Sequence, residues 1–178
     1  MKLTQQAEQS ITLQDYSKKP VIDGVEIINL KRFNDDGGSF TELARISGGI
    51  PEALPGFEIR QVNFSEMSPE AIKAFHVHRK QTDVWFVPPA DKILLVLADV
   101  RENSPTEGVI MRIPLGDCNT RLVKIPPGVA HGCKNIAPEN GSIIYFVNQV
   151  FSADPATSDE GRLPWDFFGT DVWEIEKG

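Results

Sequence analysis

The hydrophobic positions of this chain fall into short runs that are rich in β-branched and aromatic residues. Gly, Pro, Asn and Asp clusters separate these runs, and such a pattern predicts β-strands joined by turns. The predicted strands span residues 25–30, 39–46, 57–64, 71–77, 84–87, 92–98, 109–113, 121–125 and 142–150. Many short strands with Gly and Pro turns are typical of an all-β sandwich or barrel.

Helical periodicity is scarce along the chain. The exception is residues 68–74, where a serine could cap one short helical turn and a proline occupies its first position. Residues 1–20 are polar, include Lys18 and Lys19, and are predicted to form an N-terminal arm, with a single domain over residues 21–178. The aromatic-rich tail from residue 159 onward is expected to pack back onto that domain.

The overall composition excludes several classes of protein. A formal net charge of −7 argues against a nucleic-acid partner or an anionic membrane surface, since both require basic patches. No apolar run approaches the roughly 18 to 20 residues that span a bilayer, and the polar start is not typical of a signal peptide. The two cysteines, Cys118 and Cys133, are too few for a disulfide framework and suit a reducing compartment. We therefore expect a cytoplasmic protein.

The three histidines of the chain carry the strongest chemical signal. His76 and His78 are two positions apart on a predicted strand, so their side chains point to the same face. His131 follows the Pro-Gly turn at residues 126–128 and begins what resembles another strand. If the sheet closes on itself, all three imidazoles reach one cavity. The alternative is a buried core histidine and an unrelated pair on a solvated strand.

The spacing around His131 matches a known pattern. Pro126-x-Gly128-x-x-His131-x-x-x-Asn135 resembles the second motif of the cupin superfamily. More specifically, the chain from Val25 to Trp173 resembles the dTDP-4-dehydrorhamnose 3,5-epimerase family. The segments that resemble family motifs follow in the same order as in the family, at residues 35–42 (D-x-R-G-x-F-x-E), 61–65 (Q-x-N-x-S), 73–76 (R-G-L-H), 99–108 (D-x-R-x-x-S-P-T-x-G) and 130–132 (A-H-G).

This resemblance implies a cupin-type jelly roll with short N- and C-terminal extensions, working as a homodimer without a cofactor. It implies an isomerase that removes the proton next to the C4 ketone of a nucleotide-linked keto-sugar. His76 stands at the position of the general base, and imidazole has the ordinary pKa that this step needs. His131 would be a second imidazole at the ketone. Asp166 is the nearest candidate for the carboxylate that pairs with the base in the family.

Other polar residues are candidates for binding the substrate. Gln61 and Asn63 are two apart on a predicted core strand and so share a face, which suits a pocket wall. Lys73 and Arg79 flank the histidines and could neutralise a diphosphate, with His78 beside them. The alternative for the charged residues is that they are solvated at strand ends.

The chain also departs from the family pattern. Gly37 and Lys73 replace two family arginines, and Asp83 stands where the family has a lysine. The tyrosine that returns the proton in the family aligns with Phe151, which cannot donate one. Tyr145 is expected to be a packed strand residue.

The same histidines support a second hypothesis, a metal-dependent cupin such as a small-molecule oxygenase or isomerase. Histidines with one carboxylate suit a divalent transition metal. The candidate ligands are His76, His78, Asp83 and His131. A third hypothesis is a sugar-binding relative without catalytic activity.

Overall fold

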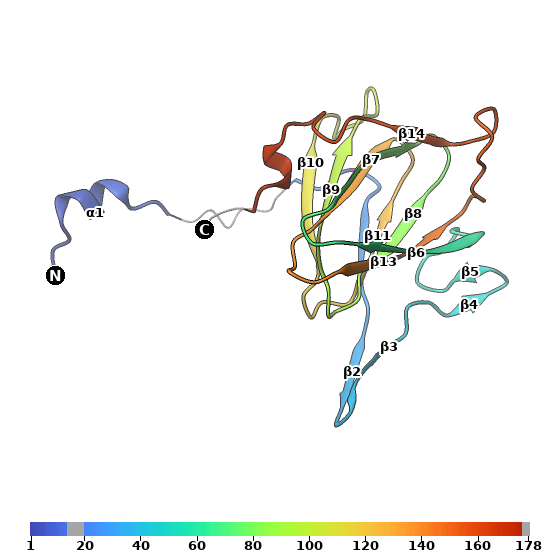
Figure 1. Cartoon of the computed structure of the whole chain (residues 1–178), viewed down its shortest axis with the longest axis horizontal. Coiled ribbons are helices and arrows are strands. Elements are labelled where there is room, and N and C mark those ends of the chain that lie inside the picture. Colours follow the sequence, from blue (N-terminus) through green and yellow to red (C-terminus); the bar gives the residue numbers. More distant parts are fainter. Residues whose placement is uncertain (14–19, 176–178) are drawn as a thin grey trace.

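The computed structural model describes residues 1–13 and 20–175 and consists almost entirely of antiparallel strands. Two five-stranded sheets face each other and form the body of the protein (Figure 1). One sheet has the order β1 (Glu26–Asn29), β11 (Arg121–Ile125), β8 (Asp83–Phe86), β13 (Gly141–Val147) and β6 (Gln61–Met67). The other has the order β10 (Ile110–Gly116), β9 (Lys92–Asp99), β12 (Val129–Asn135), β7 (Ile72–His78) and β14 (Glu160–Arg162). The predicted all-β jelly roll is confirmed.

Strand β9, which lies between β10 and β12, is buried on both of its faces. Ile93, Leu95 and Leu97 belong to the core between the sheets, while the alternate residues Leu94 and Val96 belong to a second cluster outside. This explains why β9 is a continuous apolar run instead of an alternating one. The C-terminal tail covers this outer cluster.

The tail packs as the sequence predicted. Its short 3-10 helix η1 (Asp171–Trp173) places the Trp173 ring 5.0 Å from the ring of Phe75. The Phe168 ring meets the same phenyl edge-on at 4.9 Å. Because Phe75 is fully buried by this contact, the outer face of β7 is fixed and its neighbours at 76 and 78 turn to the inside.

Several segments lie outside the two main sheets. The hairpin of β2 (Arg32–Asp35) and β3 (Gly38–Thr41) projects from the body, and the short pair β4 (Ile46–Ser47) and β5 (Ile50–Pro51) forms a separate two-stranded sheet (Figure 1). In the N-terminal arm, α1 (Gln5–Ser10) is a helix that the sequence did not predict, capped by Thr4 and without a buried residue. Lys18 and Lys19 lie outside the described residues, and the division at residue 20 stays a prediction.

Two predicted elements were wrong. Residues 68–74 do not form a helix. The carbonyl of Ser68 accepts a hydrogen bond from the amide of Ala71 in a tight turn, and strand β7 begins at Ile72. Pairing with β12 prevails here over the local proline signal, since Cys133 and Lys134 lie opposite Lys73 and Ile72. The predicted strand 39–46 divides into β3 and β4, separated by a loop. In the described part of the chain, no helix has the length and apolar character needed to cross a membrane.

Candidate functional site

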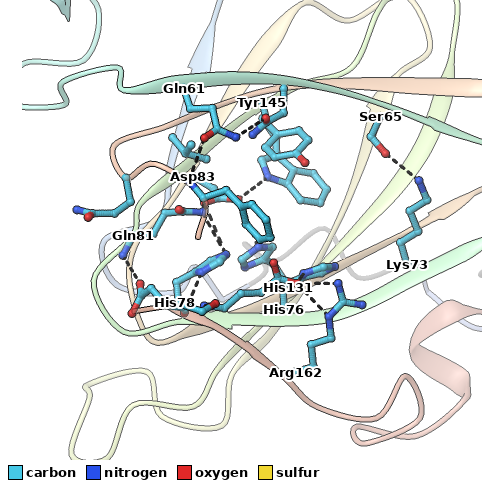
Figure 2. A pocket seen from close by; sticks show the side chains of 18 of the residues that line it. Gln61, Ser65, Lys73, His76, His78, Gln81, Asp83, His131, Tyr145 and Arg162 are labelled. Atoms are coloured by element: carbon cyan, nitrogen blue, oxygen red, sulfur yellow. Dashed lines mark hydrogen bonds and ion pairs between the residues drawn. The ribbon is translucent and has the colours of Figure 1, made fainter. Parts of the chain in front are cut away.

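A cavity of about 750 Å³ opens between the two sheets and contains the chemistry of the protein. Its walls come from β6, β8 and β13 on one side and from β7, β12 and β14 on the other. His76, His78 and His131 all line it, as their spacing predicted. Figure 2 shows these histidines together on one side of the cavity, with Gln61 and Tyr145 across from them.

A constrained turn delivers His131 to the cavity. Gly128 has a φ of 75°, and a Cβ there would lie 2.4 Å from Cγ of Arg101. The amide of Gly128 also donates to the carbonyl of His78 at 2.7 Å. Only glycine fits this position, because the left-handed backbone and the close arginine stem both exclude a side chain. The turn therefore sets where strand β12 begins.

Strand β12 then lies against β7, with His131 directly opposite His76. The two imidazole rings stack with centroids 5.9 Å apart, and the ring of His78 lies 5.4 Å from that of His131. The strands approach closely at Gly132, where a Cβ would lie 2.4 Å from Cβ of Ala74. All three imidazoles consequently form one contiguous group.

His76 is paired with a carboxylate. Its Nδ1 lies 3.1 Å from Oε1 of Glu160, which also accepts from Nη2 and Nε of Arg162 at 2.6 and 3.0 Å. Burial, helped by the nearby His131, lowers the pKa of His76, and the charge of Glu160 opposes this only in part. Burial tends to raise the pKa of Glu160, but Arg162 and His76 hold it below its ordinary value. The ionised carboxylate accepts the Nδ1 proton, so Nε2 is the basic atom of a neutral His76.

A second carboxylate, Asp83, lies deeper in the cavity and is only 3% exposed. It accepts hydrogen bonds from Nε2 of Gln81 at 2.7 Å and from Nε1 of Trp85 at 3.2 Å. Its other neighbours are imidazole nitrogens, Nε2 of His131 at 3.5 Å and Nε2 of His78 at 3.9 Å. Burial alone would raise the pKa of Asp83, but the hydrogen bond and charge of His131, followed by His78 and Gln81, lower it to about 2.

Besides His78, three of the predicted binding residues line the cavity. Gln61 donates its amide to Asn63 at 2.7 Å, so the two side chains share one face of β6. Lys73 lies at the other end, where its ammonium donates to Oγ of Ser65 at 2.8 Å and to the carbonyl of Glu66 at 2.7 Å (Figure 2).

Two predicted residues are not brought to the site. Arg79 is exposed and does not line the cavity, because β7 ends at His78 and the next side chain turns outward. Asp166 is exposed on the tail and does not line the cavity either. The carboxylate that pairs with His76 is Glu160 instead, because β14 aligns Glu160 and Arg162 along β7.

Sequence reasoning also missed three cavity residues, Glu160, Gln81 and Tyr145. Tyr145 packs against the core, as expected, but it also lies opposite Asn63 on the cavity face of the sheet. Its ring centroid is 6.0 Å from that of Trp85. Burial and then the charges of Asp83 and Glu160 raise the pKa of Tyr145, so its hydroxyl is a proton donor at neutral pH. The available signal was its even spacing from Phe151, which lines the cavity too.

Two facing antiparallel sheets with histidines in the cavity between them are typical of the cupin jelly roll. The family described as dTDP-4-dehydrorhamnose 3,5-epimerase matches residues 19–166. The chain belongs to this family. It is therefore an isomerase of the nucleotide-sugar epimerase class, which acts in polysaccharide or deoxysugar biosynthesis.

Individual relatives support the same conclusion. The spore coat polysaccharide biosynthesis protein SpsL of Bacillus subtilis is 40% identical over 146 residues, covering 82% of this chain and 91% of the relative. The dTDP sugar isomerase of Desulfovibrio desulfuricans G20 superposes with a TM-score of 0.70 at 25% identity, covering 87% of this chain and 91% of that one. The 3,5-epimerase of Legionella pneumophila was solved in complex with dTDP-4-keto-L-rhamnose. It superposes with a TM-score of 0.66 at 25% identity, covering 82% of this chain and 75% of that one.

Proposed function

We propose that this protein epimerises a dTDP-4-keto-6-deoxy sugar at a carbon next to its C4 ketone, with His76 as the general base. The observation that carries the proposal is the pair of His76 and Glu160 on one wall of the cavity, opposite Tyr145 on the other. The substrate class is supported by the Legionella relative, whose structure contains dTDP-4-keto-L-rhamnose. Gln61, Asn63 and Lys73 line the same cavity and would contact the rest of the substrate.

The proton transfers follow from the geometry. Nε2 of His76 takes the proton from the carbon next to the ketone, and the electron pair of that C–H bond moves to the ketone oxygen to give an enolate. Glu160 holds the imidazole in the required tautomer through Nδ1 and stabilises the imidazolium that forms. His131, which stacks on His76, can support the charge of the enolate once its ring carries a proton on Nε2 as well as on Nδ1.

The return of the proton needs an acid on the opposite face of the sugar. Tyr145 comes from β13 in the sheet that faces β7, so its hydroxyl approaches from the wall across from His76 (Figure 2). Its raised pKa keeps the proton available for donation. Tyr145 therefore takes the role that the phenyl ring of Phe151 cannot fill, and inversion of the carbon remains possible.

The assembly and setting of the enzyme are part of the same proposal. Phe33 and Phe40 on the projecting hairpin and Val62 and Phe64 on edge strand β6 are large apolar side chains exposed to solvent. Such surfaces favour burial against a second copy, so the protein would be a homodimer. Its two free cysteines fit the reducing cytoplasm. Val62→Asp with Phe64→Asp should halve the mass measured by light scattering after size exclusion. An unchanged mass would argue against a dimer that uses β6.

The catalytic proposal is tested by deuterium uptake into dTDP-4-keto-6-deoxyglucose in D₂O, followed by NMR. The wild-type protein should exchange a proton next to the ketone and invert that carbon. His76→Asn should slow the exchange by about 100- to 10,000-fold, the usual contribution of a general base. Tyr145→Phe should still exchange but without inversion, because His76 returns the deuteron to the face from which it took the proton.

Thermal unfolding curves provide the control that both variants fold. Wild-type exchange rates in the His76→Asn variant would exclude His76 as the base. Inversion that survives in the Tyr145→Phe variant would exclude Tyr145 as the acid.

A further inference from the structure

Beside the pair of His76 and Glu160, three further side chains of the metal-ligating kind converge. They are His78 at the end of β7, Asp83 at the start of β8 and His131 on β12, and their ligand atoms all lie within 4.8 Å of one another. The three residues are 7%, 3% and 2% exposed. Buried charged or ionisable groups require partners that compensate for the loss of water, and these three residues must supply or bind such partners.

The hydrogen bonds at Nδ1 fix the orientation of both imidazoles. Nδ1 of His131 lies 3.1 Å from the carbonyl of Val129, and Nδ1 of His78 lies 3.2 Å from the carbonyl of Asp159. A carbonyl oxygen only accepts, so Nδ1 carries the proton in both rings. In the neutral rings, each Nε2 then presents a lone pair toward Asp83. A backbone carbonyl on the second nitrogen is the usual support of a metal-ligating histidine.

The carboxylate is oriented in the same way. Trp85 donates to Oδ2 of Asp83, and Gln81 donates to Oδ1. The amide nitrogen of Gln81 also lies 3.3 Å from Nε2 of His78, so the positive end of its dipole stands between two electron-pair donors. Two imidazole lone pairs and one carboxylate thus surround a position that favours positive charge.

We propose that Nε2 of His78, the carboxylate of Asp83 and Nε2 of His131 bind one divalent transition-metal ion. Two nitrogens and one oxygen suit zinc, cobalt, nickel and iron(II), whereas magnesium and calcium prefer oxygen alone. Bond lengths of about 2.0 to 2.2 Å place neighbouring ligand atoms roughly 3 to 3.5 Å apart. The observed separations of 3.5 and 3.9 Å from Asp83 need only small side-chain rotations, with the Gln81 amide moving aside.

This set is narrower than the four residues that the sequence suggested. His76 is left out because, in the described part of the chain, the group of ligand atoms within 4.8 Å of one another consists of His78, Asp83 and His131. Three protein ligands leave coordination positions open, and all three residues line the cavity. A bound cation would stabilise negative charge on an oxygen of a ligand in that cavity. Metal binding itself does not depend on the proposed reaction, because it can be measured without any sugar.

The experiment is calorimetric titration of tag-free, chelator-treated protein with Co²⁺ and with Zn²⁺, together with the visible spectrum of the Co²⁺ form. The Cys118→Ser background is used throughout, because Cys118 is an exposed thiol that could bind these metals on its own. We expect one ion per chain. Asp83→Asn and His78→Gln should each weaken affinity by about 100-fold or more, since each removes a direct ligand. His76→Asn is the matched control and should bind like wild type.

Asp83→Glu serves as a second variant, because it keeps a carboxylate and should retain the ion even if Asp83→Asn folds poorly. The inference is overturned if the wild-type protein takes up neither ion, or if Asp83→Asn and His78→Gln bind as tightly as His76→Asn does. If the wild-type protein binds the metal but shows no deuterium uptake, the result would count against the proposed reaction and not against the metal site.

Discussion

Two buried aspartates in this fold have opposite surroundings. Asp83 lies in the cavity, and Asp99 lies at the end of β9, where the loop to β10 begins. They are 3% and 2% exposed, so burial does not distinguish them. The hydrogen-bond donors around each carboxylate distinguish the two residues.

Asp99 is surrounded by donors. Oδ1 accepts from the backbone amide and Nε of Arg101, and Oδ2 accepts from Nη2 of Arg101, Oγ of Ser104 at 2.6 Å and Oγ1 of Thr106 at 2.7 Å. The Arg101 guanidinium above all, with the two hydroxyls, holds the pKa of Asp99 far below its ordinary value. Asp83 accepts from Gln81 and Trp85 and otherwise faces imidazoles. A carboxylate with a full set of donors stabilises the fold, whereas one that faces titratable imidazoles in a cavity is available for chemistry.

The largest expected effect is a difference in the free energy of unfolding between variants of the two aspartates. Asp99→Asn should lower the free energy of unfolding at pH 7 by about 3 kcal/mol, because it leaves a partly buried arginine without its counter-charge. Asp83→Asn should lower the free energy of unfolding of the metal-free protein by a smaller amount, about 1 to 2 kcal/mol, because its depressed pKa favours the ionised carboxylate in the fold but its loss leaves no guanidinium unpaired. Urea unfolding of both variants measures the difference, and equal losses would contradict the comparison.

The pH dependence of that experiment has a definite sign. A depressed pKa in the folded state means that the contribution of Asp99 is present above its ordinary pKa and is lost as the pH falls toward the folded value. The gap between wild type and Asp99→Asn should therefore narrow below about pH 4. A gap that stays constant down to acid pH would show that the charge of Asp99 is not its source.

A smaller effect concerns the neutral donors around each carboxylate. Thr106→Val removes a donor to Asp99 and an acceptor for the amide of Asp23, and should cost about 2 kcal/mol of stability without changing Co²⁺ affinity. Trp85→Phe removes a donor to Asp83 and should weaken Co²⁺ binding by about 10-fold. Exchanged outcomes, with metal affinity lost in Thr106→Val and kept in Trp85→Phe, would reverse the roles of the two clusters.

The sequence was sufficient for much of this picture because the relevant signals are local. The period of two on β7 placed His76 and His78 on one face, and the Pro-Gly turn placed His131 beside them. Strand boundaries shifted by a few residues, but the all-β class followed from the alternation of apolar runs and turns, and the jelly roll followed from the resemblance to the family.

The missed residues depend on contacts that are distant in sequence. Glu160 reaches His76 because β14, only three residues long, pairs with β7 across more than eighty positions. Nothing in a short polar segment predicts that pairing. Arg79 was misplaced for a different reason, since the strand ends one residue earlier and its side chain faces solvent.

The turn at Gly128 has a consequence for how this enzyme can change over time. Its backbone rests against the aliphatic stem of Arg101, whose guanidinium is held by Asp99. The loop after β9 and the turn before His131 are therefore structurally coupled. During evolution, a substitution in one segment must be compensated by a substitution in the other. A screen of random variants that measures only turnover would therefore identify Arg101 as a catalytic residue. Arg101 instead acts indirectly, by supporting the turn that positions His131.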